Sequence, residues 1–318
     1  MSERHFSRRQ VIATSAAWLT SRGVCAANAA EPHVAAVAFT PDGKQIIAGS
    51  QAGVSIRDRQ SGASLRTIAT EMDNVHDLRF APDGQLVAIA GGIPGESGVV
   101  ELLDWPSGEL RQRIEAHGDV IYQVDFSSDG SRWVAASADE VCSVYELGSE
   151  KPCARFTKHS RAVLAVVMLP DGVTAVSASR DETLRVWDTM TGNSLRTLHN
   201  HSRDVHALAL QGGSDGLPVV ASASADATVR FWQPTIGRMV RFARLPSQPL
   251  SIAWVTDGTR LVAGCRDGKA RLIDPVTVKI VDTIDVSDGW LFAIDVDPTN
   301  DQRIAIGSTK GFIHMRTI

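Results

Sequence analysis

Residues 158–188 read KHSRAVLAVVMLPDGVTAVSASRDETLRVWD, and a closely related stretch follows at residues 200–233, NHSRDVHALALQGGSDGLPVVASASADATVRFWQ. Both contain short runs of alternating apolar and polar residues, which are typical of β-strands. An Asp-Gly pair lies between the first two runs, and glycine after aspartate supplies the positive φ angle of a tight hairpin turn. Each stretch therefore predicts the same unit, a meander of short antiparallel strands.

Similar units occupy most of the chain. The Asp-Gly turn recurs at a period of about 40 residues, which predicts a β-propeller; its aspartates are Asp42, Asp83, Asp129, Asp171, Asp215 and Asp257, and Asp297-Pro298 takes the same place in the last unit. We therefore expect an all-β fold, a seven-bladed propeller of four-stranded antiparallel blades over residues 32–318. The approximate repeats are 33–72, 73–117, 118–159, 160–201, 202–246, 247–287 and 288–318.

The run that ends in Val186-Trp187-Asp188 resembles the WD-repeat family, and the likeness extends more weakly over nearly all of residues 32–318. This resemblance implies a hydrogen-bonded network of His, Ser, Asp and Trp inside a blade. Two repeats hold all four residue types: His159, Ser177, Asp181 and Trp187, and then His201, Ser222, Asp226 and Trp232.

The same residue types also suggest a Ser-His-Asp hydrolase. A nucleophilic site is needed once, however, whereas this set recurs one repeat later, so we predict structural networks and no catalytic residue. Two further groups suggest metal ligands, the histidines around His201 and His206 and the aspartates Asp295 and Asp297. Neither group has the spacing of a zinc or calcium site, and we expect no metal and no cofactor.

The N-terminus has the features of an export signal. Residues 7–12, Ser-Arg-Arg-Gln-Val-Ile, resemble the twin-arginine motif of bacterial proteins, and a short apolar segment and the small residues Ala27-Asn28-Ala29 follow. We expect residues 1–29 to be a signal peptide and the protein to be periplasmic or attached to the cell envelope. The alternative is a cytoplasmic protein with a fortuitous leader.

The resemblance also raises a question about how the ring closes. WD-repeat propellers usually take the last outer strand from the start of the chain, and residues 23–29 have that position here. We expect them to lie weakly beside residues 312–317 in the full-length chain. Removal of the signal would leave the last blade with three strands.

Cys142 and Cys153 fall on consecutive strands expected in one blade. Two interpretations are open: a disulfide, which an exported protein can form between opposed strands, or two buried free thiols that fill core positions.

The formal charge of −4 and the pI of about 6.1 give no indication of a nucleic-acid-binding surface. No apolar run reaches the ~18 residues of a membrane span. Loops of repeats 4 to 6 carry arginines in equivalent places, and an exposed aromatic is expected nearby. The candidate partner-binding residues are Arg161, Arg180, Arg203, Arg266 and Trp290.

These observations favour a non-enzymatic scaffold of the WD-repeat type that binds a protein partner, with the arginines suited to an acidic segment. An exported propeller enzyme of the lactonase or quinoprotein type is the alternative. It requires ligands that converge on the central channel, and the sequence shows no such set.

Overall fold

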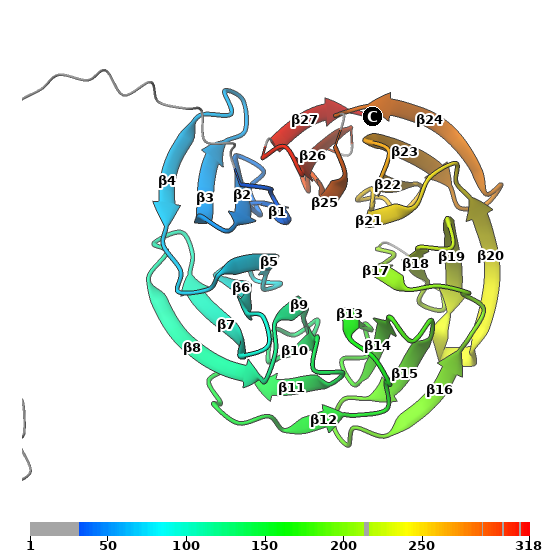
Figure 1. Ribbon diagram of the computed structural model, residues 1–318, viewed down its shortest axis with the longest axis horizontal. Helices are drawn as coiled ribbons and strands as arrows, with labels where there is room; N and C mark the ends of the chain where they lie inside the picture. The colour runs from blue at the N-terminus through cyan, green and yellow to red at the C-terminus, as the bar shows by residue number, and fades with distance from the viewer. Residues whose placement is uncertain (1–31, 213–215, 288, 301, 312) are drawn as a thin grey trace, which may run out of the picture. The chain divides into compact units, whose positions relative to one another are not determined.

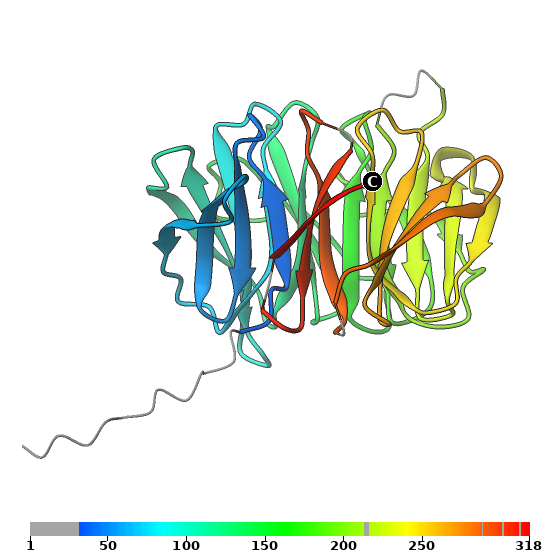
Figure 2. The same cartoon turned by 90° about the horizontal axis from the view of Figure 1, so that it is seen from above.

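The computed structural model describes residues 32–212, 216–287, 289–300, 302–311 and 313–318. Their strands, β1 to β27, form seven antiparallel sheets arranged around a central channel (Figure 1). Seen edge-on, the strands run between two faces that carry the loops (Figure 2). One 3-10 turn, η1 (Pro234–Ile236), follows β19. The fold is the seven-bladed β-propeller predicted from the repeats.

Each of the first six blades consists of four consecutive strands, a to d from the channel outwards, and the seventh has three. The strands are β1 (Ala36–Phe39), β2 (Gln45–Ser50), β3 (Gly53–Asp58) and β4 (Ser64–Ile68) in blade 1; β5 (Asn74–Phe80), β6 (Leu86–Ile93), β7 (Ser97–Asp104) and β8 (Leu110–His117) in blade 2; β9 (Ile121–Phe126), β10 (Arg132–Ser137), β11 (Cys142–Glu146) and β12 (Ala154–Phe156) in blade 3; β13 (Val163–Met168), β14 (Thr174–Ser179), β15 (Leu184–Asp188) and β16 (Ser194–Leu198) in blade 4; β17 (Val205–Leu210), β18 (Val220–Ser224), β19 (Thr228–Gln233) and β20 (Arg238–Arg244) in blade 5; β21 (Pro249–Trp254), β22 (Leu261–Cys265), β23 (Lys269–Asp274) and β24 (Lys279–Asp285) in blade 6; and β25 (Leu291–Val296), β26 (Arg303–Ser308) and β27 (Ile313–Thr317) in blade 7.

The apolar core lies between neighbouring blades. One cluster joins Val176 and Val186 of blade 4 to Val205, Leu208 and Trp232 of blade 5. Alternation along the central strands places apolar side chains on both faces of each sheet, and each face packs against the next blade. Burying one large apolar side chain contributes about 1.5–3 kcal/mol, so these interfaces hold the ring together.

A β-bulge occurs at the same place in strand a of six blades. In β5, for example, the register with β6 shifts between Val75 and Asp77. The skipped residues all line the channel near one mouth, since a bulge redirects a side chain. They are His76, Tyr122, Leu164, His206, Leu250 and Phe292.

Side chains of strand a tie successive blades together around the channel. Asp77 of β5 accepts the Val124 N–H of β9 at 2.9 Å, and Asp125 of β9 accepts the Met168 N–H of β13 at 2.8 Å. Since strand a has no neighbour on its channel side, its channel-facing amides need such partners. We call these contacts the strand-a latches.

A further latch crosses the junction between the last blade and the first. The Phe39 N–H of β1 donates to Asp295 Oδ2 of β25 at 2.7 Å, and Val34 N donates to the Ser308 carbonyl at 3.1 Å. Arg59 adds an ion pair with the buried Asp297 at 2.7 Å. The strand expected from residues 23–29 lies outside the described residues, and within them blade 7 has three strands.

The disulfide interpretation of Cys142 and Cys153 is wrong, because both thiols are free. Cys142 lies opposite Phe156 in the register of β11 and β12, and Cys153 precedes β12. The two are therefore not opposed. The other interpretation is half right: Cys142 is buried, whereas Cys153 is exposed.

The latches predict how stability depends on pH. Burial raises the pKa of Asp77 and of Asp295 to about 6, above the value of about 3.9 in an unfolded chain. A raised pKa favours the folded state while the group is protonated, so this contribution is complete below pH 4 and is lost as the pH rises through 6. The Asp77→Asn/Asp295→Asn variant keeps an oxygen acceptor in each latch and cannot titrate. We expect its free energy of unfolding, measured with urea from pH 4 to pH 8, to fall less between pH 4 and pH 6 than that of the wild type. Identical profiles would refute this assignment.

Candidate functional site

The loops before strand a and before strand c open on one face of the propeller, because both strands run in the same direction in each meander. We call this surface the loop face; it faces the viewer in Figure 1 and lies along the lower edge of Figure 2. All the candidate residues of repeats 4 to 6 lie on it or directly beneath it.

In blade 4 the structure brings His159, Ser177, Asp181 and Trp187 together. His159 Nδ1 lies 2.8 Å from Asp181 Oδ2, and His159 Nε2 lies 2.8 Å from Ser177 Oγ. Trp187 Nε1 donates to Ser177 Oγ at 3.2 Å. Because a carboxylate can only accept and an indole can only donate, His159 donates through Nδ1 and receives the serine hydrogen at Nε2.

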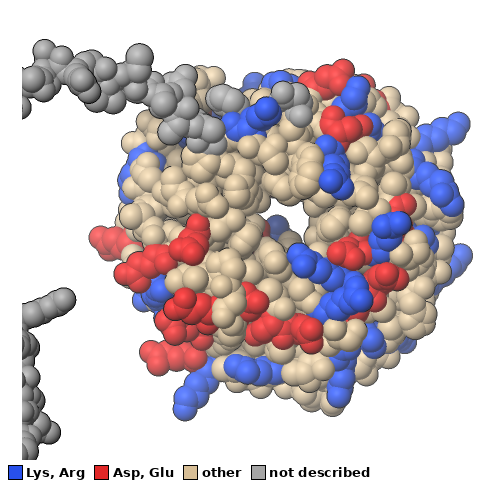
Figure 3. Space-filling view, in the orientation of Figure 1, with Lys and Arg blue, Asp and Glu red and all other residues tan. Residues whose placement is uncertain are grey.

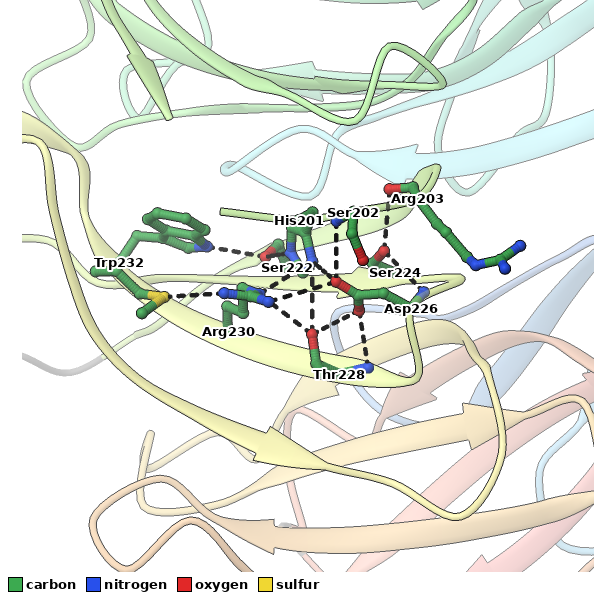
Figure 4. Close-up of polar contacts among 10 residues, drawn as sticks. His201, Ser202, Arg203, Ser222, Ser224, Asp226, Thr228, Arg230 and Trp232 are labelled. Carbon is green, nitrogen blue, oxygen red and sulfur yellow. Dashed lines mark hydrogen bonds and ion pairs between the residues drawn. The ribbon is translucent and has the colours of Figure 1, made fainter. Parts of the chain in front are cut away.

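Blade 5 repeats this geometry (Figure 4). His201 contacts Asp226 Oδ2 at 2.8 Å and Ser222 Oγ at 2.7 Å, and Trp232 Nε1 donates to Ser222 Oγ at 2.8 Å. Burial alone would raise the pKa of Asp226, but hydrogen bonds from His201 and Thr228 outweigh it and hold that pKa well below its usual range. The carboxylate is therefore ionised at neutral pH.

Neither serine can serve as a nucleophile in this arrangement. Ser177 and Ser222 are both 0% exposed, and each hydroxyl already accepts from a tryptophan while it faces a histidine. Buried and fully bonded polar groups rigidify the strands that carry them. The networks join the loop before strand a to strands b and c of the same blade.

Blade 3 shows the same network with parts missing. His117 Nδ1 contacts Asp139 at 2.9 Å, but Ala135 stands where the serine would be, and His117 Nε2 has no partner within the described residues. Tyr145 replaces the tryptophan and donates to the Ala116 carbonyl at 3.2 Å. This blade keeps half of the polar network and compensates by stacking Tyr145 on Trp133.

A second serine in these blades was not found from the sequence. Ser179 Oγ donates to the Arg161 carbonyl at 3.0 Å, and Ser224 Oγ donates to the Arg203 carbonyl at 3.1 Å. Each bond ties the loop before strand a, which carries the arginine, to the end of strand b in the same blade. The guanidinium of Arg203 extends away from the network (Figure 4), so its backbone is held while its charge stays free to meet a partner. The sequence does contain a signal for this contact, because in both repeats a second serine follows the network serine by two residues.

Arg180 and Arg266 occupy different surroundings. Arg180 lines a hollow of about 510 Å³ at the channel mouth, together with Asp73, Asp119 and Tyr122. Arg266 lies over the Trp290 ring at 4.3 Å from its centroid, a cation–π contact. Trp290 is 41% exposed, and its ring meets Phe292 at 5.8 Å edge-on.

The charges of the loop face are unevenly distributed. Acidic side chains gather over blades 2 and 3, at the lower left of Figure 3, and basic side chains surround the other side of the channel mouth, where acidic ones stand among them. The loops at residues 69–73, 94–96, 118–120 and 138–141 contain no Lys or Arg. Their acidic residues outside the blade 3 network are Glu71, Asp73, Glu96, Asp119 and Glu140.

The bulge side chains form a ring just inside the channel mouth. Burial lowers the pKa of His76 to about 4, and it lowers the pKa of His206 as well. Both histidines are therefore neutral at physiological pH. His76 meets Tyr122 edge-on at 5.2 Å, and the other bulge side chains are Leu164, Leu250 and Phe292, so the bulge ring itself is uncharged and aromatic or aliphatic.

Comparison with known families agrees with this geometry. The family model described as "WD domain, G-beta repeat" matches residues 108–146, 150–188, 192–233 and 245–274. Four of the seven repeats thus match the WD40-repeat family. Three of these matched segments contain the networks: 150–188 and 192–233 hold the two complete ones, and 108–146 holds the partial one of blade 3. The more divergent blades 1 and 7 lie outside the matched ranges.

Curated relatives are similar over parts of their length. The chain is 33% identical to the Intraflagellar transport protein 122 homolog of Danio rerio over 86 residues, which is 24% of this chain and 7% of that protein. It is 30% identical to the WD repeat-containing protein SL1-17 of Schistosoma mansoni over 35% of this chain and 36% of that protein. The Autophagy-related protein 16 of Arabidopsis thaliana is 23% identical over 84% of this chain and 44% of its own length. The chain thus spans less than half of each of these relatives.

Two further properties concern the described part of the chain. It contains no cluster of three or more His, Cys, Asp or Glu side chains placed to hold a metal ion. None of its helices is long and apolar enough to cross a membrane.

The blade 4 network gives a stability prediction. His159→Ala would leave Ser177, Asp181 and the blade strands without their shared partner, and we expect the free energy of unfolding to fall by about 1–3 kcal/mol. His199→Ala is the control, since His199 is exposed in the neighbouring loop and should change stability by less than about 0.5 kcal/mol. Urea unfolding of the two variants measures the difference. Equal effects would show that the network contributes little.

Proposed function

We propose that this protein is a non-enzymatic scaffold of the WD40-repeat type that binds a protein partner on its loop face, and that it acts after export to the periplasm or cell envelope. The observation that carries the proposal is the loop face itself: arginines whose loop backbones are clamped by buried serine networks. A surface held rigid before binding loses little conformational entropy when a partner docks.

The charge distribution suggests the polarity of the partner. An acidic segment would be attracted toward Arg161, Arg203 and Arg266 and repelled from the acidic loops of blades 2 and 3. The fourth candidate, Arg180, lines a hollow with Asp73 and Asp119 of those loops, so it lies at the boundary between the two sides. Attraction and repulsion on opposite sides of one channel mouth would also orient the segment. Trp290, partly exposed under Arg266, offers an aromatic anchor at the edge of this region.

The arginine hypothesis predicts a kinetic effect. Arg161→Glu/Arg203→Glu should slow association with the partner by about tenfold and shift thermal stability little, because exposed charges steer encounter and contribute little to folding. Arg238→Glu/Arg260→Glu is the matched control, since both arginines are exposed and lie at the opposite face, Arg238 as the first residue of β20 and Arg260 just before β22.

The partner is first captured from an envelope fraction with the wild-type protein, identified, purified and then used in surface plasmon resonance with each variant. Retained binding rates in the loop-face variant, or equal losses in both variants, would contradict the hypothesis.

Export predicts a specific mature N-terminus. When the full chain is produced in a bacterium with a twin-arginine pathway, intact-mass spectrometry of the envelope fraction should find a chain that begins at Ala30. Arg8→Lys/Arg9→Lys should leave the full-length precursor in the cytoplasm, whereas Arg4→Lys should be processed normally. A wild-type chain that keeps residues 1–29 in the cytoplasm would exclude export.

A further inference from the structure

The outer rim of blade 7 differs from that of the other blades. Six blades carry a strand d, whereas β27, a strand c, is the outermost strand of blade 7 among the described residues. An outermost strand presents backbone N–H and C=O groups that can pair with another chain. The rim lies at the side of the ring, away from the loop face (Figure 1).

The register shows which backbone groups point outwards. Ile318 N donates to the Gln302 carbonyl at 2.8 Å, in the same register that pairs Arg316 with Ile304 and His314 with Ile306. Hydrogen-bonded and non-bonded positions alternate along an antiparallel pair, so His314 and Arg316 use their amides toward β26. The backbone groups of Ile313, Met315 and Thr317 therefore face the open edge.

Side-chain burial agrees with the lack of a covering strand among the described residues. Ile313 and Met315 correspond to Leu184 and Val186 of blade 4, since both pairs oppose the same positions of strand b. Leu184 and Val186 are 0% exposed beneath strand d, whereas Ile313 and Met315 are only partly buried. Among the described residues, no strand d lies beside Ile313 and Met315, whereas a strand d covers the equivalent residues of the other six blades.

The other blades show what kind of strand fits. Three strands d share one pattern, with an exposed aliphatic residue first and a more buried one last: residues 65–68 (LRTI), 195–198 (LRTL) and 281–284 (VDTI). The last residue of the pattern lies opposite the position equivalent to Ile313, as Leu198 lies opposite Leu184 and Ile68 opposite Val54. A complementary strand for β27 should therefore place a large aliphatic residue opposite Ile313.

The sequence before β1 does not supply this pattern. Strand d ends four to seven residues before the next strand a in the six complete blades, which assigns the end of a corresponding strand to positions 29–32, Ala-Ala-Glu-Pro. None of these four is a large aliphatic residue, and Val24 is the only Val, Leu or Ile among residues 23–29, five positions before that end.

We propose that the edge of β27 is a second interaction site, which binds an extended segment of another protein by strand addition. The segment carries the strand-d pattern: an aliphatic residue, two polar residues and a second aliphatic residue that sits opposite Ile313. Main-chain hydrogen bonds to Ile313, Met315 and Thr317 hold it, and the aliphatic residue sets its register. This site does not depend on the loop face or on export.

The test uses the full chain and a fluorescent peptide with the sequence of residues 190–198, MTGNSLRTL, which forms strand d of blade 4. Fluorescence polarisation should show saturable binding at least about tenfold tighter than that of a peptide with the same residues scrambled. Hydrogen exchange should show the amides of Ile313, Met315 and Thr317 unprotected in the free chain and protected with the peptide.

Two results would overturn the proposal. One is protection of these three amides in the peptide-free monomer, which would mean that the chain covers its own edge. The other is their protection in a dimer detected by light scattering, which would mean that a second copy covers it. Equal affinity for the two peptides would likewise exclude the stated pattern.

Two variants of the full chain locate the binding. Met315→Pro removes an outward amide and leaves the β26 ladder intact, so peptide binding should be lost while far-UV circular dichroism is unchanged. A second variant carries MTGNSLRTL fused after Ile318, where it can fold back as strand d. This fusion should raise the melting temperature and abolish peptide binding, and a fusion with the scrambled sequence should do neither. Peptide binding that survives the native fusion would place the peptide elsewhere.

Discussion

The innermost strand of each blade has no neighbour on its channel side, and the rest of the molecule depends on how that exposed backbone is managed. Carboxylates and an amide on strand a accept N–H groups of the next blade, as Asp77, Asp125 and Gln123 do. A propeller has no central core, so these contacts supply both hydrogen bonds and the order of the blades around the ring. The apolar interfaces farther out then pack in a fixed orientation.

The loops of the loop face are held by a second set of contacts, the polar networks inside the blades. Where the blade networks are complete, in blades 4 and 5, buried histidines and serines hold the loops that display Arg161 and Arg203. In blade 3, where the network is incomplete, the loop face carries acidic residues instead. Blade 6 keeps only Asp267 of the four network residues and still displays Arg266, so the charge of a loop varies independently of the network beneath it.

The repeat pattern was sufficient to predict the blade count and the strand order, because both recur within one repeat. The resemblance to the WD-repeat family, and not the pattern alone, implied which residues meet in the two networks. Features that join different repeats were missed. Asp77 finds its partner at Val124, in the next blade, and nothing within either repeat indicates that pairing. The ring of bulge residues from His76 to Phe292 also emerges only when the blades are placed around one axis. The acidic side of the loop face was overlooked for a similar reason, since it is made of single residues from four loops.

Each blade from β1 to β24 is built from four consecutive strands, so every sheet is formed by one continuous segment of the chain. A substitution inside one blade is felt mainly by that blade and its two neighbours. Such a chain can accept changes in one sector while another keeps its polar network. Blades 4 and 5 have matching networks and blade 1 has none of the four network residues, yet all three close the same ring.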